Sequence, residues 1–291
     1  MSRFVIYYNA AYFALKTIAD LPYTHVILAF IEPDPNDPSG TRVAPSGNLA
    51  SVWDDVPLLQ QAGKKVMISF GGGAFSSAAY EKLAGDVTSL AAQIAAIVAQ
   101  YNLDGVDLDY EDTAALGSSG SYDGVTFATT LTEALYHQLP ADKRVITHAP
   151  QPPYLAPSFE NGPYLRILQQ AGAYISWINL QFYNNPGFQD PAQITGLSGT
   201  PFVTSVTGLD QGVGGVKWPA EQIVVGKPVA PQDAGSGYLP VETLVSEVIT
   251  PLVDHYGARF GGVMGWQYYN DAAGGGAWHT AIAKALPQAT T

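Results

Sequence analysis

The sequence contains no cysteine, few basic side chains and no long apolar run. Without cysteine, disulfide bonds, thiolate catalysis and cysteine-ligated metals are excluded. No stretch approaches the roughly 18 apolar residues that a membrane-spanning helix needs. No charged segment followed by an apolar one precedes the first apolar run, so we expect this chain to be soluble and to contain no signal peptide; whether one was removed stays open.

The scarcity of basic residues also limits the ligands. Only 13 Lys and Arg residues face 25 Asp and Glu residues, which gives a formal net charge of -12. An acidic surface repels phosphates, so nucleic acid and anionic membranes are disfavoured as partners, whereas a neutral ligand such as a carbohydrate is compatible. The five histidines show no metal-ligand spacing, so no metal site is predicted. We expect a monomer.

Eight short apolar runs alternate with longer segments of helical periodicity. The runs predict strands at 3–9, 25–31, 65–71, 105–111, 144–150, 177–183, 222–228 and 262–268. The clearest helices are predicted at 86–100, 123–139, 160–172 and 240–256. Several strands are apolar at nearly every position, as in a parallel sheet covered on both faces. The pattern predicts an α/β fold, a single (β/α)8 TIM barrel over residues 1–291 without an insertion domain.

The stretch LDGVDLDYED crowds acidic residues onto the fourth predicted strand. Because side chains alternate along a strand, Asp107, Asp109 and Glu111 share one face, and Glu111 falls at the carboxyl end, where barrel enzymes carry their active sites. A solvated acidic edge or a cluster balanced by arginine is the alternative. Carboxylates this close cannot all ionise cheaply, so one is expected to hold a proton, as a general acid requires. Asp104 and Asp112 are expected in turn or helix-capping roles.

The segment DGVDLDYE resembles the DxxDxDxE signature of glycoside hydrolase family 18, which includes chitinases and endo-β-N-acetylglucosaminidases. Other segments are also similar to motifs of this family: KVMISFGGG (65–73), APQPPY (149–154), NLQFYNN (179–185) and GGVMGWQYYND (261–271). They look most like the short plant-type, hevamine-like chitinases. The resemblance implies a barrel, no cofactor and no metal.

The resemblance also implies a role for each matching residue. Glu111 would protonate the glycosidic oxygen, and the acetamide of the substrate would replace the enzyme nucleophile. Asp109 would accept the acetamide N–H, while Asp107 shares a proton with Asp109. Tyr183 would donate to the acetamide carbonyl, and Trp266 would form the floor beneath the reacting sugar. A core tyrosine and plain barrel packing are the alternatives for these last two residues.

Further candidate substrate-binding residues lie on or next to other predicted strands. They are aromatic or polar side chains for which core packing is the alternative. These candidates are Gln181, Asn184, Tyr7, Phe30 and Ser69.

Three functions remain open at this point. The first is a retaining endo-chitinase that acts on chitin or N-acetylglucosamine oligosaccharides, and the second is an endo-β-N-acetylglucosaminidase that cleaves the chitobiose core of N-glycans. The third is an inactive chitin-binding lectin or inhibitor. Aromatic residues in the loops favour an extended groove: Tyr12, Phe13, Phe75, Tyr154 and Phe188. Secretion is implied by the resemblance alone.

Overall fold

The computed structural model describes residues 2–9 and 12–287. The strands of this part form one sheet: β1 (Arg3–Tyr8), β2 (His25–Pro33), β3 (Val43–Pro45), β4 (Lys65–Gly71), β5 (Gly105–Asp109), β6 (Val145–His148), β7 (Trp177–Gln181), β8 (Ile223–Pro228) and β9 (Gly262–Trp266). Eight strands are parallel and close in the order β1-β9-β8-β7-β6-β5-β4-β2, because β1 also pairs with β2. The short β3 adds to β2 in the antiparallel direction.

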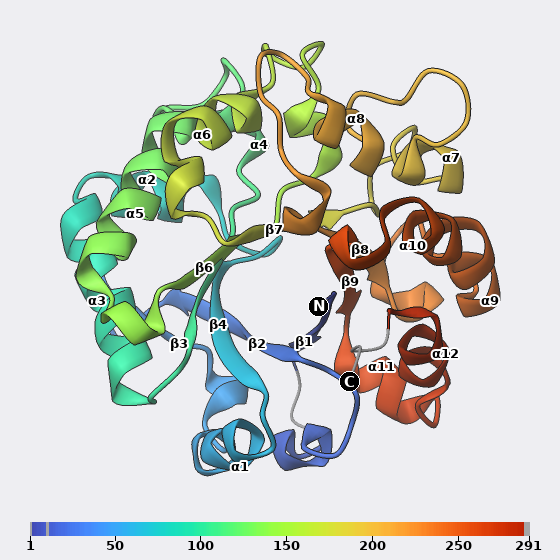
Figure 1. Cartoon of the computed structure of the whole chain (residues 1–291). Coiled ribbons are helices and arrows are strands. Elements are labelled where there is room, and N and C mark those ends of the chain that lie inside the picture. Colours follow the sequence, from blue (N-terminus) through green and yellow to red (C-terminus); the bar gives the residue numbers. More distant parts are fainter. Residues whose placement is uncertain (1, 10–11, 288–291) are drawn as a thin grey trace.

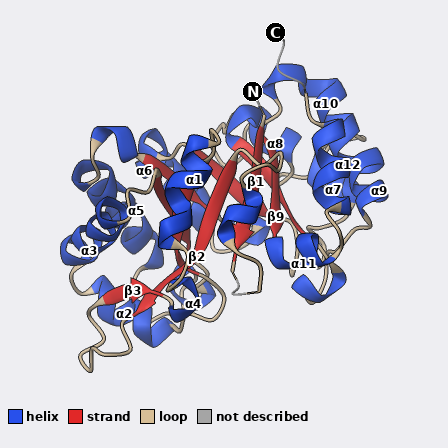
Figure 2. Ribbon diagram, turned by 90° about the horizontal axis from the view of Figure 1, so that it is seen from below, coloured by secondary structure: helices blue, strands red, loops and turns tan. Residues whose placement is uncertain are grey.

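Helices surround the closed sheet, as Figures 1 and 2 show. Their bounds are α1 (Val56–Gln61), α2 (Ser77–Ala84), α3 (Val87–Gln100), α4 (Thr113–Leu116), α5 (Gly124–Gln138), α6 (Pro163–Ala171), α7 (Pro191–Thr195), α8 (Val206–Gln211), α9 (Val241–Thr243), α10 (Thr250–Tyr256), α11 (Tyr268–Ala273) and α12 (Ala277–Ala285). The predicted TIM barrel is therefore confirmed. Between β8 and β9 the described chain holds only helical segments and turns, with no insertion domain.

The two faces of the strands have different partners. Outward side chains such as Phe4 and Ile6 belong to a large apolar cluster between strands and helices. Inward side chains form a separate, smaller cluster of Val5, Tyr7, Ile27, Ala29, Met67, Trp177, Tyr183, Val224 and Met264. Strand alternation places Asp107 and Asp109 on the inner face, so the barrel interior holds both apolar and acidic side chains.

Two predicted strands end earlier than expected. The predicted strand 105–111 ends at Asp109, and the predicted strand 177–183 ends at Gln181. In β5 the pairing with β4 stops at Asp109, whose carbonyl accepts a hydrogen bond from the Gly72 amide in the loop after β4. Glu111 and Tyr183 therefore lie in loops, two residues beyond their strands.

The predicted helix 240–256 is broken into α9, a π-helical segment (Leu244–Ile249) and α10. Pro251 lies in the first turn of α10 and has no N–H to donate, which accounts for the change of helical pairing just before it. No single helix in the described ranges is long and apolar enough to cross a membrane, and α2 and α3 would be so only as a pair bent by 103°.

Candidate active site

A cavity of about 290 Å³ opens at the carboxyl ends of the barrel strands. Loops after five strands and residues on two others meet around it. Its lining residues are Asn9, Phe30, Gly73, Ala74, Asp109, Glu111, Gln181, Tyr183, Asn184, Asp233 and Trp266. Seven of these were candidates from the sequence alone, and the barrel brings them together from β2, β5, β7 and β9.

Asp107 lies beneath this cavity and is completely buried. Its Oδ2 accepts hydrogen bonds from the hydroxyls of Tyr7 and Ser69, both at 2.7 Å. Its Oδ1 accepts from the Thr147 hydroxyl at 2.5 Å and from Asn179 Nδ2 at 3.2 Å. Burial raises the pKa of Asp107, and these four donors offset part of the rise. The carboxylate is thus held by protein donors instead of water.

Asp109 and Glu111 form a hydrogen-bonded pair above Asp107. Burial raises the pKa of Asp109 well above its usual range, and the charges of Glu111 and Asp107 add to the rise. Burial also raises the pKa of Glu111, which accepts a 2.8 Å hydrogen bond from Gln151 Nε2. Gln181 Nε2 donates to Asp109 Oδ1 at 2.7 Å and orients it. The pair therefore holds a proton near neutral pH.

The proton sharing between Asp107 and Asp109 that the resemblance implies stays a prediction. The four donors around Asp107 occupy its oxygens. The hydrogen bond of Asp109 instead runs to Glu111. The charges of Glu111 and Asp107 both add to the raised pKa of Asp109.

Tyr183 lines the cavity, and no described residue accepts a hydrogen bond from its hydroxyl. Burial is the main cause that raises the pKa of Tyr183 well above its usual value, and the negative charges of Asp109 and Glu111 raise it further. The hydroxyl therefore keeps its proton and serves as a donor. The loop after β7 is fixed by Asn184, which has a φ of +56° and accepts hydrogen bonds from the amides of Gly235 and Ser236.

Trp266 ends β9 and forms the apolar wall of the cavity. Its ring lies 5.7 Å from Tyr7 and 5.8 Å from Phe30, measured between ring centroids. An indole face of this kind stacks well on a pyranose ring. Gly72 brings its backbone against Phe30, since a Cβ there would lie 2.9 Å from the ring, and its φ of +95° suits glycine.

Two of the expected substrate contacts lie elsewhere. Tyr7 and Ser69 do not line the cavity; both are buried and donate to Asp107, so they support its floor. Sequence reasoning also missed three polar residues near Glu111 or in the cavity wall: Asn9, Gln151 and Asp233. Asn9 and Gln151 lie in loops, and Asp233 lies in a short 3-10 helix (Pro231–Asp233), so no periodic pattern indicates which way these side chains point.

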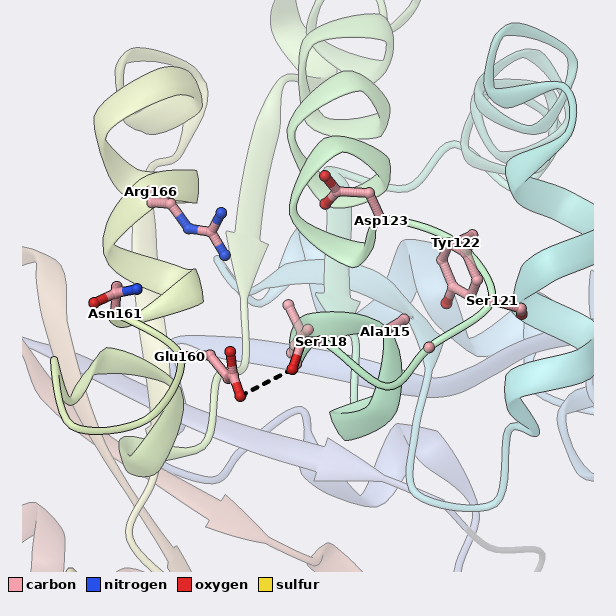
Figure 3. Close-up of a pocket in the computed structure, with 11 residues that line it drawn as sticks. Ala115, Ser118, Ser121, Tyr122, Asp123, Glu160, Asn161 and Arg166 are labelled. Atoms are coloured by element: carbon pink, nitrogen blue, oxygen red, sulfur yellow. Dashed lines mark hydrogen bonds between the residues drawn. The ribbon is translucent and has the colours of Figure 1, made fainter.

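A separate hollow of about 490 Å³ lies between the loop before α5 and the start of α6, as shown in Figure 3. Ser118 donates to Glu160 there at 3.2 Å, and Arg166 and Asp123 face the same hollow. None of the candidate residues lines it, so the chemistry is assigned to the smaller cavity around Glu111.

No group of three His, Asp or Glu side chains within residues 2–9 and 12–287 could hold a metal ion. The chemistry available to the described site is that of paired carboxyl groups, a protonated tyrosine and an indole wall. Such a set can protonate a leaving oxygen and stabilise positive charge on a sugar.

The family model of glycosyl hydrolases family 18 matches residues 3–230. The chain belongs to this family and is a glycoside hydrolase, which confirms the resemblance of its motifs. The family assignment is consistent with the carboxylates on and after β5.

Relatives named as chitinases match most of the chain. Acidic endochitinase SE2 of Beta vulgaris is 29% identical over 270 residues, covering 86% of this chain and 80% of that protein. An acidic endochitinase of Nicotiana tabacum is 30% identical and covers 78% of this chain and 70% of its own length. The crystal structure of a GH18 chitinase from Pseudoalteromonas aurantia is similar, with a TM-score of 0.86, 37% identity and coverage of 98% and 100%.

Proposed function

We propose that this protein is a retaining endo-chitinase that hydrolyses β-1,4-linked N-acetylglucosamine polymers by substrate-assisted catalysis. The observation that carries the proposal is the cavity in which the Asp109–Glu111 pair, an unpartnered tyrosine hydroxyl and the Trp266 ring meet. An acetamide fits this set, because it offers an N–H to a carboxylate and a carbonyl oxygen to a hydroxyl. The chitinase names of the relatives support the same substrate.

In the proposed first step, Glu111 gives its proton to the glycosidic oxygen, and the bond from that oxygen to C1 breaks. The acetamide oxygen of the same sugar forms a bond to C1 and replaces an enzyme nucleophile. Tyr183 holds that oxygen in line, and Asp109 accepts the acetamide N–H as positive charge spreads over the new ring. The leaving chain departs with the proton of Glu111.

In the second step, the Glu111 carboxylate takes a proton from water, which attacks C1 and opens the oxazolinium ring. Two displacements on one carbon leave its configuration unchanged, so the product is the β-anomer. Asp107 lies too deep to touch the sugar, and its negative charge favours the protonated state of the pair above it.

Digestion of an N-acetylglucosamine pentamer and of a high-mannose glycopeptide, followed by mass spectrometry, tests this function. We expect cleavage of the pentamer by the native protein and none by Glu111→Gln. Cleavage of the glycopeptide alone would move the assignment to N-glycan processing. No cleavage of either substrate, with binding of the pentamer retained, would make the protein a lectin.

We further propose that residues 1–291 act as one monomeric catalytic domain. We propose that it acts outside the cell, where the enzyme can reach a polymer such as chitin. The continuous barrel from β1 to β9 supports the single domain. Light scattering of the purified protein tests the monomer, and a mass of about twice 30.8 kDa would reject it. Immunoblotting of culture medium tests the location.

A further inference from the structure

A second cavity, of about 340 Å³, continues the catalytic one beyond Phe30. The two cavities share Phe30 and Ala74, so they lie next to each other. Besides these, the second cavity is lined by Glu32, Pro33, Gly71, Gly72, Phe75, Ser76 and Ala79. Its walls are mostly apolar, and Glu32 is the one charged side chain among them.

An aromatic strip leads from one cavity to the other. The rings of Trp266 and Phe30 lie 5.8 Å apart between centroids and are inclined by only 30°. The two rings form a stacked pair, so a β-linked chain whose reacting sugar lies against Trp266 can extend its next sugar past Phe30 into the second cavity. Glu32 follows Phe30 by two residues on β2, so its carboxylate borders the neighbouring sugar.

The Glu32 carboxylate has no hydrogen-bond or ion-pair partner among the described residues. Partial burial raises its pKa, because no cation or donor compensates it. Arg42, on the adjoining hairpin, is paired with Asp34 at 3.1 Å. In contrast, Asp233 in the catalytic cavity is held by Asn270 Nδ2 and the Ala230 amide.

Neither cavity is lined by a lysine, an arginine or a histidine, while four carboxyl groups line the two. The strip thus offers apolar ring faces and uncompensated negative charge. A sugar that suits both properties carries an ammonium group on a pyranose ring. That sugar is glucosamine, the deacetylated unit of chitin.

We propose that Glu32 makes the second cavity a subsite that selects glucosamine next to the reacting N-acetylglucosamine, so that the enzyme prefers partly deacetylated chitin. This inference rests on the proposed function. The reacting sugar itself has to keep its acetamide, because that group is the nucleophile. The Glu32 carboxylate pairs with the ammonium group of the neighbour, which a neutral N-acetylglucosamine cannot offer.

The test compares kcat/KM on fully acetylated hexamers and on partly deacetylated hexamers, for native protein and Glu32→Gln. We expect the ratio of deacetylated to acetylated rates to fall about two- to fivefold in the variant, as for a partly exposed ion pair. Glu81→Gln is the matched control, because it removes the same charge as Glu32→Gln. Glu81 is exposed on the adjacent α2 and lines neither cavity. Its ratio should equal that of the native protein.

Two further readouts separate a direct ion pair from general repulsion. Sequencing of the products should show glucosamine enriched at one unit beside the reacting N-acetylglucosamine, and this enrichment should vanish in Glu32→Gln. The preference should also weaken between low salt and 0.5 M salt, because salt screens exposed charges. The inference would be overturned if Glu32→Gln still cuts acetylated hexamers but leaves both the ratio of deacetylated to acetylated rates and the product sequences unchanged. If the native protein does not cut acetylated hexamers, the proposed function fails instead.

Discussion

Replacing Asp109 by asparagine should stabilise the protein near pH 8 while it abolishes most of the activity. The carboxyl is buried, and burial together with Glu111 and Asp107 raises its pKa. The native state therefore binds this proton more tightly than the unfolded state, and stability falls as the pH rises past the unfolded pKa. An asparagine stays neutral, and it can still accept from Gln181 and donate to Glu111.

The size of the stability gain can be estimated from the spacing of Asp107 and Asp109 along β5. Side chains two residues apart on one strand face are separated by about 7 Å. Two charges at that distance repel by about 2 kcal/mol at an effective dielectric constant of about 20. Because Asp109 escapes part of this repulsion by holding a proton, we expect a gain of about 1–2 kcal/mol, or about 2–3 °C in Tm. The loss of the carboxylate should lower kcat about a hundredfold.

Thermal unfolding followed by circular dichroism at pH 8 and pH 4.5 measures the effect. The gain of Asp109→Asn over native protein should shrink at pH 4.5, because this pH is close to the pKa of the unfolded carboxyl and keeping Asp109 protonated then costs little free energy. Asp104→Asn is a control of opposite sign: burial alone would raise the pKa of Asp104, but hydrogen bonds from the Val66 amide, Gln60 and Lys65 lower it. This variant should lose stability at pH 8. A lower Tm for Asp109→Asn at pH 8 would refute the reasoning.

Three other changes test the site and its supports. Since Glu111 has a raised pKa and acts as the acid, kcat/KM on the pentamer should fall as the pH rises past that value, and a flat profile would exclude this role. Gly72→Ala forces a Cβ against Phe30 at positive φ and should cost about 1–3 kcal/mol in urea unfolding. Burial lowers the pKa of Lys227 to about 7, so native stability relative to Lys227→Met should rise by about 1.4 kcal/mol per pH unit from pH 7 to 9.

The barrel strands could be predicted because a buried parallel strand is apolar along its whole length, as Val26 to Leu28 illustrate. The inward phase of Asp107 and Asp109 also follows from strand alternation alone. The exact end of β5 could not be predicted, since it depends on a hydrogen bond from the amide of Gly72, in the loop after β4, to the Asp109 carbonyl. Local sequence contains no signal for a contact of this kind.

Loop residues were harder to assign for a related reason. Asp233 and Gln151 enter the site through irregular segments whose path is fixed by tertiary contacts, such as the hydrogen bond of Asp233 with Asn270. Tyr7 and Ser69 lie on the expected inner face, but both are buried and donate to Asp107. Alternation gives the direction of a side chain and does not tell whether another residue covers it.

The buried carboxyl groups of the site account both for the expected stability gain of Asp109→Asn and for the proposed chemistry. The carboxyl groups of Asp107, Asp109 and Glu111 are gathered in a barrel interior whose cavity is lined by no cation. This arrangement costs stability in the empty protein, because burial and mutual repulsion oppose ionisation. A sugar that develops positive charge at C1 supplies the missing counter-charge at the transition state, so the electrostatic cost is relieved only as the bond breaks. Substitutions that relieve it permanently, such as Asp109→Asn, should therefore stabilise the fold and slow the reaction together.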